Sequence, residues 1–107
     1  MIRIVYRRAD HCITVDGHAG CGRKGRDPVC AAVSALVLTA AGNVLQLSAQ
    51  ESVSGEVVML KPGDARVECT PKPHMAEVVT LMLDTICTGF ELLQNHYPEN
   101  VRFRIVG

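Results

Sequence analysis

The chain has 107 residues, which suffices for one domain with its own hydrophobic core. Eleven basic and eleven acidic side chains give a formal net charge of zero, which argues against recruitment to nucleic acid or an anionic membrane by net charge. The five cysteines are an odd number without the spacing of a disulfide framework, so we expect a reducing cytoplasm and mostly buried thiols.

The N-terminal part of the chain predicts a β-hairpin. In residues 2–7, Ile2, Ile4 and Tyr6 alternate with Arg3, Val5 and Arg7, which is the period of two that is typical of a half-buried strand. These residues lack the apolar run of a signal peptide. A turn at residues 9–10 and a second alternating run at 11–17 complete the hairpin. If the extended geometry continues, His18 points away from the face that carries Val15.

A glycine-rich loop and a long helix follow the hairpin. The loop is expected at residues 19–27, and its glycines permit backbone conformations that other residues avoid. Asp27 is a favoured N-cap and Pro28 is favoured at the first helical position. Apolar side chains then recur at helical spacing as far as Leu47, where we expect the helix to end. This helix contains the most apolar stretch of the chain, residues 29–49, but polar residues interrupt it, so no membrane span is expected.

The second half of the chain predicts three more strands and a second helix. A loop is expected at residues 49–55 and a turn at residues 62–64. The expected strands are 57–60, 65–70 and 101–105, and the expected helix is 74–96. The element order is therefore ββαββαβ, which indicates an α+β fold with a mixed sheet and two helices in a single domain, residues 1–107.

The apolar sector of the predicted second helix is wider than one contact with a core requires. Leu81, Leu83, Cys87 and Leu92 extend it. Either a second copy of the chain covers this excess in a homodimer, or the domain's own sheet and loops cover the helix on two sides. Both alternatives remain open at this stage.

His18 and Cys30 are the strongest candidates for chemistry. If Asp27 is the N-cap, Cys30 is the third helical residue, where unpaired amides and the positive end of the helix dipole favour a thiolate. A nearby histidine would complete a pair of nucleophile and base. Ser34 lies four residues further on the same helical face and could donate a hydrogen bond, and the free amides could hold an oxyanion. Asp27 could cap the helix, orient His18, or do both.

Each of these residues also has a purely structural interpretation. A cysteine in an alanine-rich helix is typical of a packed core, a histidine beside glycines is typical of a turn, and Asp27 can be a plain N-cap. A zinc site is a further alternative, although the spacing lacks the short paired knuckle of zinc fingers. Its ligands would be His18, Cys21 and Cys30, with His11 or Cys12.

The segments around His18 and Cys30 resemble a known family. Gly17-His18-Ala19, followed after a short loop by residues 25–34 (GRDPVCAAVS), is similar to the signature of the bacterial ribosomal-processing cysteine proteases, the Prp family. The likeness in length and element order covers nearly the whole chain. The resemblance implies that Cys30 is the nucleophile and His18 the general base, with Asp27 and Ser34 supporting the site. It also implies a substrate loop that contains Gly20, Cys21, Gly22, Arg23, Lys24 and Gly25.

The resemblance further implies a function. Members of the family are cytosolic, usually homodimeric endopeptidases that remove an N-terminal extension from large-subunit ribosomal protein number twenty-seven, cutting after a pair of aromatic residues. On this basis we expect a cysteine endopeptidase without a cofactor or metal, and without a membrane or nucleic-acid partner. The alternative is a non-catalytic ribosome-associated or RNA-binding module that uses the loop arginines with Arg102 and Arg104. Zero net charge and few aromatic residues count against it.

Overall fold

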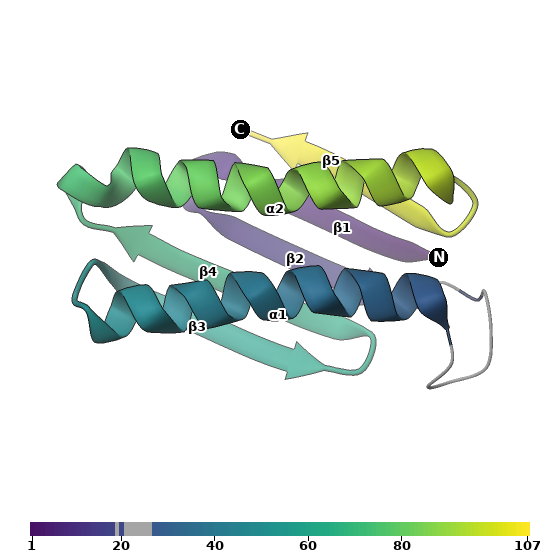
Figure 1. Cartoon of the computed structure of the whole chain (residues 1–107), viewed down its shortest axis with the longest axis horizontal. Helices are drawn as coiled ribbons and strands as arrows, with labels where there is room; N and C mark the ends of the chain where they lie inside the picture. Colours follow the sequence, from purple (N-terminus) through teal and green to yellow (C-terminus); the bar gives the residue numbers. More distant parts are fainter. Residues whose placement is uncertain (19, 21–26) are drawn as a thin grey trace.

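The computed structural model describes residues 1–18, 20 and 27–107 (Figure 1). Two short 3-10 turns, Arg8–Asp10 and Pro73–Met75, accompany the regular elements. The strands are β1 (Ile2–Arg7), β2 (Cys12–Gly17), β3 (Val53–Lys61), β4 (Asp64–Pro71) and β5 (Val101–Val106), and the helices are α1 (Pro28–Ala49) and α2 (Ala76–His96). The predicted order ββαββαβ and the α+β class are confirmed.

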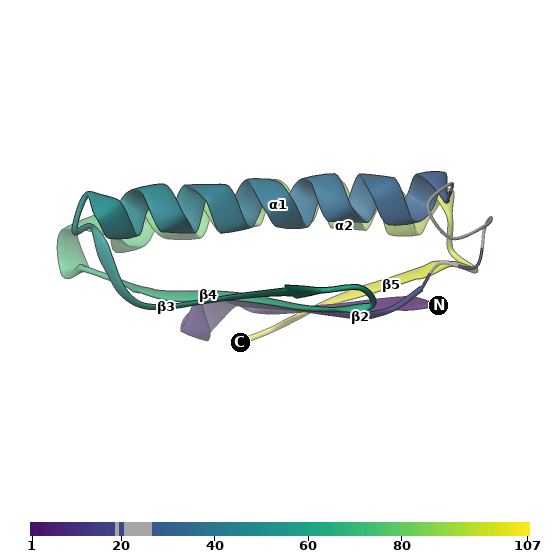
Figure 2. The ribbon, with the colours of Figure 1, turned by 90° about the horizontal axis from the view of Figure 1, so that it is seen from below.

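The five strands form one mixed sheet in the order β3-β4-β2-β1-β5. Only β1 and β5 run parallel, and the other neighbours are antiparallel. Figure 2 shows that both helices lie on the same face of this sheet, so the core is the layer between helices and strands. Ile4 is in register with Val15 on one side and with Phe103 on the other. These side chains belong to or pack against the core because alternate residues of each strand face the helices.

The two helices pack side by side over the sheet (Figure 1). In α1, buried residues from Val29 to Val44 recur at helical spacing and face the core. Gly89 of α2 leaves room for Leu36 of α1, since a Cβ on Gly89 would lie 2.8 Å from a methyl carbon of that leucine. The close contact between the helices therefore depends on a small residue in α2.

Helix α1 is also long and apolar enough to cross a membrane, judged by length and composition alone. Its most apolar window has a mean hydropathy of 1.8, and 33% of that window is buried inside the domain. The core helix of a globular protein passes the same test, so this property is weak evidence for a membrane. Here the buried face of α1 packs on the sheet.

Strand β3 begins earlier than the sequence indicated. Residues 53–55 were expected in a loop, but Val53 is buried and pairs with Pro71 of β4. The register shifts between Ser54 and Val57, where Gly55 has a φ of +57°, so the strand contains a β-bulge. The sequence did not predict this part of the strand for two reasons. The segment is polar, and residues around a bulge do not show the regular alternation of a strand.

Candidate active site

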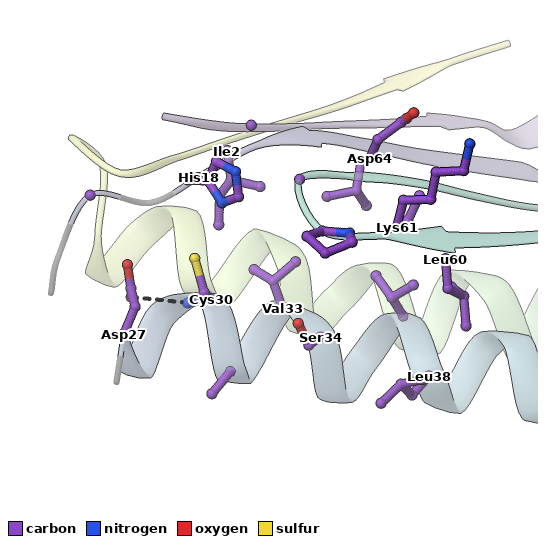
Figure 3. A pocket seen from close by; sticks show the side chains of 18 residues that line it. Ile2, His18, Asp27, Cys30, Val33, Ser34, Leu38, Leu60, Lys61 and Asp64 are labelled. Carbon is purple, nitrogen blue, oxygen red and sulfur yellow. Dashed lines mark hydrogen bonds between the residues drawn. The ribbon is translucent and has the colours of Figure 1, made fainter. Parts of the chain in front are cut away.

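A groove of about 720 Å³ lies between α1 and the strands beside it. The end of β2, the first half of α1 and the turn between β3 and β4 form its walls (Figure 3). All four residues that the sequence singled out for chemistry line this groove: His18, Asp27, Cys30 and Ser34. The fold therefore brings together residues from the end of a strand and the start of a helix.

His18 points toward α1, which differs from the expected direction. The alternation of β2 predicted that His18 would point away from the face of Val15, yet both residues line the groove. The reason is Gly17, whose φ of +93° breaks the extended geometry directly before His18. A Cβ on Gly17 would also lie 2.1 Å from the carbonyl oxygen of Met1, so no other residue fits this turn.

Asp27 caps α1 as predicted. Its carboxylate oxygen Oδ1 accepts hydrogen bonds from the amide of Val29 at 2.9 Å and from the amide of Cys30 at 3.1 Å. Asp27 is buried, with 8% of its surface exposed, so these hydrogen bonds are shielded from water. The cap fixes the first turn of the helix and with it the backbone of Cys30. A further role of Asp27 in orienting His18 stays a prediction.

The expected oxyanion hole at the start of α1 is not supported. Pro28 has no amide hydrogen, and the amides of Val29 and Cys30 donate to the Asp27 carboxylate. The amide of Ala31 donates to the Asp27 carbonyl at 3.0 Å. An oxyanion would have to compete with Asp27 for every one of these donors, because the N-cap satisfies the groups that a helix start leaves free.

Cys30 differs from the other cysteines that the structure describes. Cys12, Cys69 and Cys87 are buried, and burial raises the pKa of each of these thiols, that of Cys87 to about 12. Cys30 is half-buried and lines the groove. The prediction that most cysteines are buried thiols is thus confirmed for three of the four described ones, and Cys30 is the accessible exception.

The groove continues beyond the candidate pair along α1. Ser34 lies on the exposed side of the helix about one turn from Cys30 (Figure 3). Further along, Val37 and Leu38 of α1 face Leu60 of β3 across the groove. The opposite wall of the groove, which the sequence did not indicate, belongs to the β3–β4 hairpin and comprises Leu60, Lys61, Pro62, Gly63, Asp64 and Ala65. Nothing in the local pattern of these residues indicates contact with His18 and Cys30, which lie roughly 30 to 47 positions earlier in the chain.

The predicted substrate loop is described at one position. Gly20 lines the groove and has a φ of +73°. Cys21, Gly22, Arg23, Lys24 and Gly25 lie outside the described residues.

The structure separates His11 and Cys12 from His18 and Cys30, and Cys21 lies outside the described residues. His11 lies at the opposite end of β2 from His18, and its Nε2 contacts Thr80 Oγ1 at 2.9 Å. Cys12 does not belong to the core between sheet and helices, whereas Cys30 packs against that core. Within residues 1–18, 20 and 27–107, no group of three or more His, Cys, Asp or Glu side chains is arranged to hold a metal ion.

The arginines of the suggested RNA-binding surface lie away from the groove. Arg102 and Arg104 are exposed on β5 and alternate with Val101 and Phe103, which face the helices. They therefore project from the face of the sheet that the helices leave open (Figure 2).

A family model identifies the family of this chain, and solved structures share its fold. The family model described as cysteine protease Prp matches residues 1–102. A crystal structure of the ribosomal processing protease Prp from S. aureus with a covalently linked product peptide aligns with a TM-score of 0.79 and 22% identity, covering 98% of this chain and 99% of that one. The same S. aureus protease with a substrate peptide gives a TM-score of 0.72 at 22% identity and the same coverage.

A third solved structure, SMU.848 from Streptococcus mutans, has a TM-score of 0.66 and 24% identity over 98% of this chain and 91% of that chain. At these identities the solved structures bear out the fold. No curated protein matches the chain.

Proposed function

The chain belongs to the Prp family of cysteine proteases, and from this premise we propose that it is a ribosomal-processing endopeptidase. Its substrate is large-subunit ribosomal protein number twenty-seven with an N-terminal extension, which it cuts after a pair of aromatic residues in the cytoplasm. The S. aureus relative, a ribosomal processing protease crystallised with a substrate peptide, supports this choice of substrate.

One observation carries the proposal: the thiol of Cys30 and the imidazole of His18 point toward one another across the mouth of the groove (Figure 3). Two segments that the sequence separates by a loop thus contribute one nucleophile and one base. Cys30 is also the accessible cysteine of the four described ones.

The reaction then proceeds in two stages. The Cys30 thiolate attacks the scissile carbonyl carbon and a C–S bond forms. His18, as imidazolium, protonates the leaving amine while the C–N bond breaks, which leaves a thioester on Cys30. His18, now neutral, takes a proton from water while the water oxygen bonds to the thioester carbonyl carbon. The C–S bond then breaks, which releases the second product as a carboxylic acid and restores the Cys30 thiolate and the His18 imidazolium. Asp27 holds the start of α1 in place, and Ser34 offers a hydroxyl at the same side of the groove.

The apolar part of the groove suits an aromatic pair. Beyond the candidate site, Val33, Val37 and Leu38 of α1 and Leu60 of β3 supply apolar side chains. Burial of one Phe side chain from water contributes roughly 1.5–3 kcal/mol, so two such side chains would strongly favour binding beside Cys30.

We also propose that the enzyme is a homodimer that buries apolar residues of the helical layer. Leu83 and Cys87, which widen the apolar sector of α2, are buried in the domain's own core. Other large apolar side chains of the two helices remain more than half exposed. They are Leu45, Val78, Leu81 and Leu92, in addition to Leu38, which lines the groove. A second copy of the chain would remove this surface from water.

The function is tested by replacing the nucleophile. Cys30→Ala should abolish cleavage of the extended ribosomal protein, observed by mass spectrometry of the products, because no thiolate remains to form the thioester. Cys69→Ala is the matched control: it removes a buried thiol of the same size, and activity should persist. Cleavage by Cys30→Ala at the wild-type rate would falsify the assignment.

A further inference from the structure

The imidazole of His18 lies against Gly63, in the turn between β3 and β4. A Cβ placed on Gly63 would be 2.6 Å from Nε2 of His18, 3.0 Å from Cε1 and 3.4 Å from Cδ2. Real Cβ atoms essentially never approach other atoms at the shortest of these distances, so a side chain at residue 63 would force the His18 ring to shift. The contact involves one edge of the ring, the edge that carries Nε2.

The same turn also holds the backbone beside His18. The amide of Gly17 donates a hydrogen bond to the carbonyl oxygen of Gly63 at 2.9 Å. Because Gly17 directly precedes His18, the turn fixes the end of β2 as well as the ring that extends from it. The position of His18 over the groove therefore depends on a segment 45 residues further along the chain.

We propose that Gly63 is a positioning residue for the reaction. By packing against the Nε2 edge of His18, it holds the ring in place over the groove and keeps the imidazole aligned with Cys30. Figure 3 shows the imidazole between the sheet and the thiol, in agreement with this role. The inference rests on the proposed function, since it assumes that His18 is the base for Cys30.

A purely conformational role is the competing explanation for a glycine at this position. Gly63 has a φ of +72°, which L side chains rarely adopt, so its replacement strains the turn whatever surrounds it. Gly55 provides a matched control in the same hairpin, with a φ of +57°. A Cβ on Gly55 would meet only Thr70 Oγ1, at an ordinary distance of 3.7 Å. Gly63→Ala and Gly55→Ala thus share the backbone strain, but only the first disturbs His18.

The two variants are compared with the wild type and His18→Ala in a steady-state cleavage assay on the extended ribosomal protein. Gly63→Ala should lower kcat about 100-fold while KM changes little, because a displacement of about 1 Å in a reacting group has an effect of that size. Gly55→Ala should keep kcat close to the wild-type value. Both variants should lower the midpoint of thermal unfolding by a similar amount. Equal kcat values in Gly63→Ala and Gly55→Ala would overturn the proposal.

A second measurement does not depend on activity. With ¹⁵N-labelled histidine, the resonances of the two ring nitrogens of His18 are observed by NMR at one fixed pH. Gly63→Ala should shift these resonances, whereas Gly55→Ala should leave them at their wild-type positions. Unchanged His18 resonances in Gly63→Ala would refute the positioning role. If the wild type fails to cleave the ribosomal protein, the proposed function fails, while the NMR comparison still decides whether Gly63 positions His18.

Discussion

Asp27 is the residue on which the start of α1 depends. One carboxylate oxygen accepts two amide hydrogen bonds, and the residue is buried. Cys30 owes its place at the groove to this cap, because the third helical residue moves whenever the first turn frays. The same arrangement occupies the amides at the start of α1, so an oxyanion could bind there only by replacing Asp27 as their acceptor.

Two substitutions separate the roles of Asp27. Asp27→Ala should lower the free energy of unfolding by about 0.5–2 kcal/mol, because alanine cannot accept the two amide hydrogen bonds. Asp27→Asn should preserve stability, since asparagine is an equally good N-cap. If Asp27 also orients His18 through its charge, Asp27→Asn should lower kcat although the protein stays folded. Chemical denaturation and the cleavage assay on both variants give the answer; wild-type activity in Asp27→Asn would limit Asp27 to capping.

At the level of elements, α2 is tied to the sheet by a polar contact far from the groove. The buried hydroxyl of Tyr6 in β1 donates to Asp84 Oδ1 at 2.9 Å, and Arg8 donates to both oxygens of the same carboxylate. Hydrogen bonds from Arg8, and to a smaller extent from Tyr6, hold the pKa of Asp84 below its ordinary value. Burial, with the Asp84 hydrogen bond, raises the pKa of Tyr6.

Removal of this contact should destabilise the domain. Asp84→Ala leaves the Tyr6 hydroxyl buried without its acceptor, at a cost of roughly 1–3 kcal/mol in the free energy of unfolding. Tyr6→Phe, the control, removes the hydroxyl as well as its need for a partner and should cost less. Urea unfolding of the two single variants measures the difference; a larger loss in Tyr6→Phe would contradict this interpretation.

The lowered pKa of Asp84 also predicts a pH dependence. A carboxyl group with a lower pKa in the folded state stabilises the fold above its unfolded pKa, and this contribution disappears as the pH falls through the folded pKa. The stability difference between the wild type and Asp84→Ala should therefore be largest near neutral pH and shrink in acid. Urea unfolding from pH 7 to pH 2 tests this, and a constant difference would rule it out.

At the scale of the whole molecule, the two layers give the domain two outer surfaces that differ in polarity. The helices cover one face of the sheet, and the other face displays charged side chains such as Arg102 and Arg104. The outer surface of the helices carries apolar residues, of which Leu81 is the most exposed at 68%. An apolar helical surface on a small domain is typical of an interface between copies.

The proposed dimer is tested on this surface. Leu81→Glu should convert the dimer to a monomer without unfolding it, because an exposed side chain contributes little to the domain's own core. Val57→Glu on β3 is the control, since Val57 is also exposed, at 40%, but does not belong to the helical layer. Light scattering coupled to size-exclusion chromatography reports the mass. A monomeric wild type, or a Leu81→Glu variant that remains dimeric, would exclude this interface.

Sequence patterns alone determined the element order and the start of α1. Alternation, helical spacing and the Asp27-Pro28 pair involve only neighbours within a few residues. Such local patterns can be recognised in the sequence without knowing the fold. They also identified His18 and Cys30 as candidates for chemistry. The local pattern failed where the backbone departs from regular geometry, at the bulge in β3 and at Gly17.

Only the tertiary structure decided how His18 meets Cys30. The direction of His18 depends on the positive φ of Gly17, and its ring packs on Gly63, which belongs to a hairpin that the sheet order places beside β2. The use of the first-turn amides by Asp27 likewise became visible only in the hydrogen bonds. Contacts between segments that are distant in the chain depend on how whole elements pack together. They therefore produce no periodic pattern of residues from which the sequence could predict them.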